Sequence, residues 1–130
     1  MKILRWSWLG FGLVWVIAIF YFSLMPHPPQ PMQFWGADKL QHALSYGLLM
    51  LWFCQVYRQR QSRLVLAMAL VAMGISIEYL QGESGYRLFE YADMLANVTG
   101  VVVGWVWART GLGRVFAYIE NHVAGKNRQA

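Results

Sequence analysis

The sequence has few charged residues and contains long stretches without any. Asp, Glu, Lys and Arg make up 13% of the 130 residues, whereas hydrophobic residues make up 58%. An average soluble domain has about 25% charged residues. A soluble protein this apolar would lack the polar groups needed to cover its core, but a membrane accepts an apolar exterior. The composition therefore predicts a membrane protein with a single domain.

Cysteine and proline are also scarce. Cys54 is the only cysteine, so no disulfide can form within the chain and no cysteine pair is available to hold zinc. All four prolines lie between Pro26 and Pro31, a segment that cannot continue a helix. The HExxH pair of many zinc enzymes is absent as well. We therefore expect no metal and no cofactor, although His, Asp and Glu side chains can ligate zinc.

Four apolar runs are long enough to form transmembrane helices. The first, residues 6–25, has 20 residues without a charge, which matches a hydrocarbon core about 30 Å thick. The predicted helices cover about residues 6–25, 40–57, 64–81 and 91–108. Asp38 is the predicted N-cap of the second helix. We therefore expect an all-α polytopic membrane protein, with a small bundle of four transmembrane helices in residues 1–110.

The basic residues predict the orientation of these helices. Nine of them fall on one side of the four runs and two on the other, and cytoplasmic loops hold the positive excess. The nine are Lys2, Arg5, Arg58, Arg60, Arg63, Arg109, Arg114, Lys126 and Arg128, and the two are Lys39 and Arg87. Both termini are therefore predicted to be cytoplasmic, and the charge of +5 is interpreted as an orientation signal, not as a nucleic-acid surface. Residues 111–130 are predicted to form a cytoplasmic tail with an interfacial amphipathic helix.

Polar residues gather at the outward ends of three predicted helices, and helical periodicity places them on shared faces. They are Asp38, His42, Ser45 and Tyr46 on the second helix, Glu78 and Gln81 with Gly74 on the third, and Asp93 and Asn97 with Gly100 and Gly104 on the fourth. Small residues spaced as GxxxG let helix backbones approach closely in a membrane. Ionisable groups at such positions indicate a functional site, but a structural network of ion pairs would give the same pattern.

Within this set, His42 is the candidate proton carrier because histidine titrates near neutral pH. A carboxylate such as Asp93 or Glu78 could set its tautomer, so these three residues are the candidate catalytic residues. The candidate ligand-binding residues are Asp38, Lys39, Tyr46, Gln81, Arg87 and Asn97. Lys39 and Arg87 would contact the acidic part of a ligand. Arg87 is close enough in sequence to the fourth helix to join Asp93 and Asn97.

The chain resembles the VanZ-like family over about four fifths of its length. The motifs that carry the resemblance are Ser23-x-x-Pro26, Asp38-Lys39-x-x-His42-x-x-x-Tyr46, Glu78-x-x-Gln81, Arg87 and Asp93-x-x-Ala96-Asn97-x-x-Gly100-x-x-x-Gly104. One departure is Gly85-Tyr86-Arg87, where the resemblance leads us to expect Pro-Gly before the arginine. The resemblance implies a small protein of the bacterial inner membrane, related to one that is associated with resistance to the glycopeptide teicoplanin.

Two functions fit these observations. In the first, the outer cluster binds or modifies a lipid-linked or anionic envelope component at headgroup depth. In the second, the protein is a non-enzymatic membrane module that organises an envelope component or a partner protein. A proton pathway is disfavoured because the inner halves of the predicted helices are apolar. The expected partners are membrane lipid and a lipid-linked envelope precursor, and four short helices leave so little room for an enclosed cavity that a homo-oligomer would help to form one.

Overall fold

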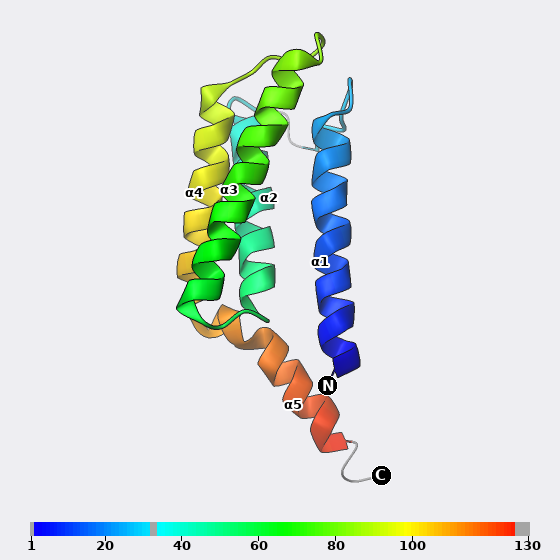
Figure 1. Cartoon of the computed structure of the whole chain (residues 1–130), viewed down its shortest axis with the longest axis vertical. Helices are drawn as coiled ribbons and strands as arrows, with labels where there is room; N and C mark the ends of the chain where they lie inside the picture. Colours follow the sequence, from blue (N-terminus) through cyan, green and yellow to red (C-terminus); the bar gives the residue numbers. More distant parts are fainter. Residues whose placement is uncertain (1, 32–33, 127–130) are drawn as a thin grey trace.

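The computed structural model of the chain describes residues 2–31 and 34–126, and over these residues it contains helices and no strand. The elements are α1 (Lys2–Ser23), α2 (Ala37–Cys54), α3 (Arg60–Glu83), α4 (Tyr91–Trp107), the short 3-10 helix η1 (Gly111–Arg114) and α5 (Val115–Lys126). The prediction of an all-α fold is confirmed. Both termini lie at one end of the molecule, and the α1–α2 and α3–α4 loops lie at the other (Figure 1).

The start of α2 differs from its prediction. The helix begins at Ala37 and ends at Cys54, so it is shifted toward the N-terminus relative to the predicted 40–57. The prediction that Asp38 is the N-cap is wrong, because that position belongs to Gly36. Gly36 has a φ of +78°, a left-handed conformation that glycine adopts at little cost. Asp38 instead lies in the first turn, where its negative charge faces the positive end of the helix dipole.

Helices α2 and α4 pack most closely, and glycines make this possible. A Cβ atom on Gly100 would collide with the backbone carbonyl of Ala43, and one on Gly104 would collide with that of Gly47. Two small residues on α2, four positions apart, therefore face the Gly100-x-x-x-Gly104 motif of α4. The prediction that this motif brings α4 against a neighbouring backbone is confirmed, and the neighbour is α2.

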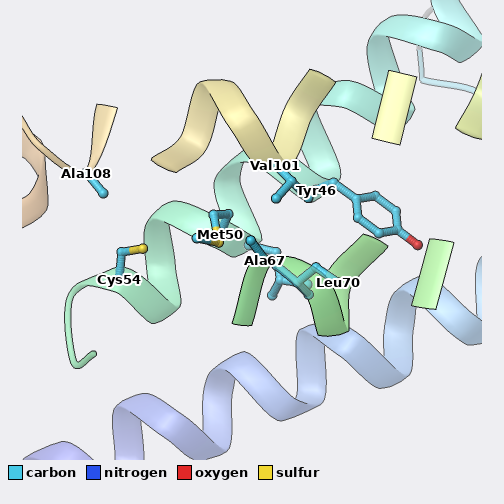
Figure 2. Packing of buried hydrophobic residues seen from close by; sticks show 8 residues of the cluster. Tyr46, Met50, Cys54, Ala67, Leu70, Val101 and Ala108 are labelled. Atoms are coloured by element: carbon cyan, nitrogen blue, oxygen red, sulfur yellow. The ribbon is translucent and has the colours of Figure 1, made fainter. Parts of the chain in front are cut away.

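A hydrophobic cluster fills the space between α2, α3 and α4. Its buried members are Tyr46, Leu49, Met50 and Cys54 from α2, Ala67 and Leu70 from α3, Val101 from α4 and Ala108 just beyond it. Figure 2 shows Tyr46 at one end of the cluster, with Cys54 and Ala108 toward the other. Because Tyr46 is also part of the polar face, the core continues directly into the polar end of the bundle.

Helix α1 stands beside the other three helices (Figure 1). Near its N-terminal end, the rings of Trp8 and Trp52 stack with their centroids 3.9 Å apart. Each indole N–H also donates to the other residue's backbone carbonyl, at 3.2 Å from Trp8 and 3.0 Å from Trp52. Two partly buried indoles that stack in nearly parallel planes, with both N–H groups satisfied, make a firm attachment. This contact fixes one end of α1 against α2.

The tail joins the same end of the molecule. The side-chain N–H of Gln55 donates to the carbonyl of Leu112 at 2.8 Å, and its Oε1 accepts from the backbone N–H of Phe116 at 3.3 Å. The Phe116 ring is buried and meets Trp8 edge-on. A helix within the predicted tail of residues 111–130 is thus present as α5. Residues 127–130, including Arg128 of the basic set, lie outside the described part of the chain.

The outer surface of the helices is strongly apolar. Large hydrophobic side chains are exposed on each of the first four helices, among them Phe11, Leu13, Leu44, Leu48, Met68, Ile75, Val102 and Val106. Two helices, α1 and α3, are long and apolar enough to cross a membrane, each with a mean hydropathy of 1.8. Helices α2 and α4 are shorter, with 18 and 17 residues.

Candidate functional site

The polar end of the bundle centres on His42, one turn inside α2. Its Nδ1 atom lies 3.1 Å from Oδ1 of Asn97, and its Nε2 atom lies 3.4 Å from Oδ2 of Asp93. Asn97 and Asp93 belong to α4 and are 2% and 6% exposed. Asn97 also packs against Gly74 of α3, where a Cβ atom would approach its Nδ2 to 2.9 Å. The structure therefore brings His42, Asp93 and Asn97 together, as their helical faces predict.

Lys39, in the first turn of α2, contacts three carboxylates next to this group. Its Nζ atom is 2.6 Å from Asp38, 2.5 Å from Glu90 and 2.6 Å from Oδ1 of Asp93. Asp38 and Lys39 precede the apolar part of α2. Partial burial alone would lower the pKa of Lys39, but its hydrogen bonds to the three carboxylates outweigh burial and raise that pKa. The hydrogen bond from Lys39 likewise lowers the pKa of Asp38. The charge of Lys39 is therefore already shared within the protein.

Glu78, on α3, is fully buried. Its Oε2 atom accepts a hydrogen bond from the backbone N–H of Glu90 at 3.2 Å. Its Oε1 atom and the hydroxyl of buried Tyr46 have no hydrogen-bond partner among the described residues. Most buried polar atoms in folded proteins are paired, because an unpaired one loses its hydration without compensation. Two such atoms at one end of the bundle therefore indicate a region that can receive another group.

Carboxylates outnumber cations at this end of the bundle. Asp38, Glu78, Glu90 and Asp93 gather around one lysine and one histidine. Two sets of three side chains bring potential metal-ligand atoms within 4.8 Å of one another. The set of Asp38, Glu90 and Asp93 already surrounds the Lys39 ammonium. Within the described part of the chain, the set of His42, Glu78 and Asp93 has no lysine or arginine contact apart from the one that Lys39 makes with Asp93.

A pocket of about 380 Å³ opens between α1 and α2, beside His42. One wall is apolar and is formed by side chains of α1 and by the proline segment, including Trp15, Ile19, Phe22, Pro28 and Pro29. The other wall carries the polar side chains His42, Tyr46, Gln81 and Arg87. The pocket is therefore amphipathic, with its polar groups on one side.

Two hydrogen bonds attach the outer end of α1 next to this pocket. Gln81 Nε2 donates to the carbonyl of Ser23 at 2.7 Å, and the Tyr86 hydroxyl donates to the carbonyl of Leu24 at 2.8 Å. Together with the Trp8–Trp52 contact, they fix α1 at both ends. The pocket lies between α1 and the rest of the bundle, near the attachment that Gln81 and Tyr86 make.

Arg87 does not join Asp93 and Asn97, so the prediction that it does is wrong. It lines the pocket and makes no ion pair with any residue in the described ranges 2–31 and 34–126. Gly85, two positions earlier, has a φ of +75° and turns the loop. A glycine thus supplies the turn where the family resemblance led us to expect Pro-Gly. Beyond this turn, Arg87 lines the pocket together with side chains of α1.

Glu90 was not among the predicted site residues. It contacts Lys39 through its carboxylate and Glu78 through its backbone N–H, so it connects α2 with α3. It lies in the loop just before α4, where no helical periodicity relates it to either partner. Asp38 and Lys39 belong to the ion network, whereas Tyr46, Gln81 and Arg87 line the pocket. The predicted ligand-binding residues thus divide between two neighbouring places.

Comparison with known proteins adds one sequence relative. The chain is 30% identical over 95 residues to an uncharacterized protein of Schizosaccharomyces pombe, and the alignment covers 71% of this chain and 56% of the yeast protein. The chain therefore spans little more than half the length of that relative. No family model matches the sequence, and no solved structure matches it.

Proposed function

We propose that α1 to α4 all cross a membrane, with both termini on the cytoplasmic side. The exposed hydrophobic side chains on all four helices support this, because water would leave them uncovered. Even the 17 residues of α4 span about 25 Å, close to the thickness of a hydrocarbon core. The basic residues near the start of α1, the α2–α3 connection and the end of α4 lie at the end with the termini, as the positive-inside rule requires.

We further propose that the pocket binds an anionic amphiphile, such as a lipid-linked envelope component, at headgroup depth. The observation that carries this proposal is the position of Arg87, a cation without an acidic partner among the described residues, in a pocket whose opposite wall is apolar. Arginine binds phosphate and carboxylate groups through two parallel hydrogen bonds. A volume of about 380 Å³ suits a headgroup and the first part of a chain, while the rest of the chain would lie in the bilayer.

The contacts of His42 favour binding over turnover. Its Nδ1 faces Asn97 and its Nε2 faces Asp93, so both ring nitrogens already meet protein groups. Proton transfer to a bound ligand would require one of these contacts to open. A module that binds without turnover, the second function considered from the sequence, therefore agrees better with this geometry than an enzyme in which His42 is the proton carrier.

Membership of the VanZ-like family and a role in glycopeptide resistance belong to the same proposal. They rest on the sequence motifs, and the amphipathic pocket is compatible with an envelope ligand. The yeast relative favours a ligand class found beyond bacteria, such as an anionic phospholipid or a polyprenyl phosphate. Teicoplanin susceptibility of a Gram-positive host with and without the protein tests the resistance role separately.

The test of binding uses the full chain in detergent and native mass spectrometry. The probes are phosphatidylglycerol, undecaprenyl phosphate and the zwitterionic phosphatidylcholine. We expect the wild-type protein to retain one or both anionic probes at least ten-fold better than phosphatidylcholine. Arg87→Ala should remove this preference and Arg87→Lys should keep part of it.

Arg58→Ala serves as the matched control, because Arg58 is a basic residue in the connection between α2 and α3, at the opposite end of the bundle (Figure 1). It should bind the probes as the wild type does. Equal retention of anionic and zwitterionic probes by the wild type, or an unchanged preference in Arg87→Ala, would contradict the proposal. Conversion of a bound probe to a product would show turnover and overturn the assignment as a binding module.

A further inference from the structure

We propose that His42, Glu78 and Asp93 form a binding site for a divalent metal ion of the zinc class. One potential ligand atom from each lies within 4.8 Å of the others, although the three come from α2, α3 and α4. The sequence predicted no metal because it has neither an HExxH pair nor a cysteine pair. This inference does not depend on the proposed function of the pocket.

Each of the three side chains has one atom held by a protein partner and a second atom that can bind an ion. His42 uses Nδ1 for Asn97, and Asp93 uses Oδ1 for Lys39. Glu78 uses Oε2 for the backbone N–H of Glu90. Metal-binding histidines and carboxylates are commonly fixed in this way by outer hydrogen bonds, which set the tautomer and the direction of the free lone pair. Such a pattern is expected of metal ligands.

The distances are close to those of a tetrahedral site. Zinc binds histidine nitrogen and carboxylate oxygen at about 2.0–2.2 Å, which places neighbouring ligand atoms about 3.4 Å apart. His42 Nε2 and Asp93 Oδ2 are 3.4 Å apart already. The widest separation in the set, up to 4.8 Å, requires that the two ligand atoms come closer by up to about 1.4 Å. A side-chain rotation of Glu78 would supply this movement.

Charge and burial provide a second, independent observation. Glu78 is fully buried, and its Oε1 atom has no hydrogen-bond partner among the described residues. Among the described residues, Lys39 is the one ammonium that contacts the group, through Asp93, and two further carboxylates, Asp38 and Glu90, share it. An isolated buried carboxylate is strongly disfavoured unless a cation or a proton compensates it. A divalent ion between Glu78 and Asp93 would provide that compensation.

The ligand types indicate which ion fits. One imidazole nitrogen with two carboxylates suits zinc, manganese or iron, whereas calcium and magnesium prefer sites made only of oxygen atoms. Three protein ligands leave a fourth position, which is the arrangement of catalytic zinc sites and not of structural ones. A small anion or a water molecule could occupy that position.

The test uses the full chain purified with an affinity tag that contains no histidine, in a His27→Gln, His122→Gln background. His42 is then the only histidine in the sequence. After chelation and dialysis, the protein would be titrated with Zn²⁺ and with Mg²⁺ by calorimetry. It would also be titrated with Co²⁺, whose visible absorption reports four-coordinate geometry. We expect one Zn²⁺ per chain, a Co²⁺ spectrum of four-coordinate type, and binding of Mg²⁺ at least ten-fold weaker.

The ligand variants His42→Phe, Glu78→Gln and Asp93→Asn should each weaken Zn²⁺ binding at least ten-fold. Asn97→Ala should weaken it ten- to one hundred-fold while leaving all three ligands in place. Glu83→Gln, an exposed carboxylate on the same helix as Glu78, is the matched control and should bind as the parent does. Absence of saturable Zn²⁺ binding in the parent protein would overturn the proposal, whether or not the variants fold. Equal affinity in the parent and in all of the ligand variants that fold would overturn it too.

Discussion

The Nδ1 atom of His42 lies 3.1 Å from Oδ1 of Asn97, and this contact between α2 and α4 decides which ring nitrogen faces Asp93. An amide oxygen only accepts hydrogen bonds, so Nδ1 carries the hydrogen and Nε2 is directed to the carboxylate. Because the glycines of α4 bring its backbone against α2, this side-chain contact depends directly on helix packing. Several consequences can be measured.

The effects of His42→Gln and Asp93→Asn on stability should be non-additive. The two side chains are in contact, and contacting residues typically couple by about 0.5–3 kcal/mol. The free energy of unfolding would be measured in detergent for both single variants and the double variant. Asp93→Asn combined with His122→Gln is the control pair, because His122 lies in α5, away from the polar end, and should give additive effects. Additive effects for His42 and Asp93 would show that their contact contributes no coupling.

Enlarging the small residues between α2 and α4 should destabilise the protein. Gly104→Ala places a Cβ atom against the carbonyl of Gly47, and such overpacking typically costs about 1–3 kcal/mol. Gly10→Ala in α1 is the matched control, since a Cβ atom there has no neighbour within 4 Å. The control should be neutral or slightly stabilising, because alanine favours helix. Thermal unfolding in detergent distinguishes the two. Equal melting temperatures would mean that α4 can move away from α2 at little cost.

Replacing Lys39 should destabilise the protein, because carboxylates outnumber cations at the polar end. In Lys39→Met, Asp93 loses its ammonium partner, and loss of one member of a buried pair costs about 3–5 kcal/mol, reduced here because Lys39 is partly exposed. Lys2→Met, at the opposite end, should change stability little. If the double variant Lys39→Met, Asp93→Asn is more stable than Lys39→Met alone, the unpaired carboxylate of Asp93 is the cause of the loss. An unaffected Lys39→Met protein would contradict the charge argument.

The same network predicts a dependence on pH. Lys39 lowers the pKa of Asp38 below its ordinary value of 3.8, so this ion pair stabilises the folded state fully above pH 3.8. The contribution is lost as the pH falls through the lowered pKa. Acidification from pH 6 to pH 3 should therefore destabilise the wild type more than Lys39→Met, as measured by urea unfolding at each pH. A parallel decline of both proteins would exclude the pair as its source.

Cysteine labelling can test the proposed topology. Gln61→Cys and Glu83→Cys, both at exposed positions at opposite ends of α3, would be made in a Cys54→Ala background. A membrane-impermeant maleimide added to intact cells or spheroplasts should label Glu83→Cys only. Both variants should react once the membrane is permeabilised. Preferential labelling of Gln61→Cys in intact cells would show that the orientation is the reverse of the proposed one.

The helices and the central contact were predictable because each is encoded by spacing along one helix. Apolar runs and the proline segment indicated the helices, and the shared face of Asp93, Asn97 and Gly100 indicated which side of α4 turns inward. The start of α2 is not predicted correctly, because Asp38 is a residue type that commonly caps helices and so gives the stronger sequence signal. The actual cap, Gly36, acts through its left-handed backbone conformation, which the sequence does not reveal.

Positions in loops could not be derived in the same way. Arg87 lies six residues before Asp93, but it follows a left-handed turn at Gly85 and lines the pocket. Glu90 meets Lys39 across 51 residues of sequence, and no periodicity relates the two. The pocket itself depends on the distance between α1 and α2, which is set by the Trp8–Trp52 stack and by the hydrogen bonds of Gln81 and Tyr86. Such distances follow from packing between helices and have no local sequence signal.

The attachment of α1 also has a consequence for synthesis of the protein. Two hydrogen bonds fix its C-terminal end. One joins Ser23 to Gln81, which is 58 positions later in the sequence, and the other joins Leu24 to Tyr86, which is 62 positions later. In the proposed four-span arrangement, α1 leaves the ribosome first and stays in the bilayer without these bonds until α3 and the following loop have been made. Until then, the side chains of α1 do not yet form the apolar wall of the pocket beside His42 and Tyr46. In that arrangement, α1 has to remain near the insertion machinery, or to return by diffusion in the membrane, before the pocket can form.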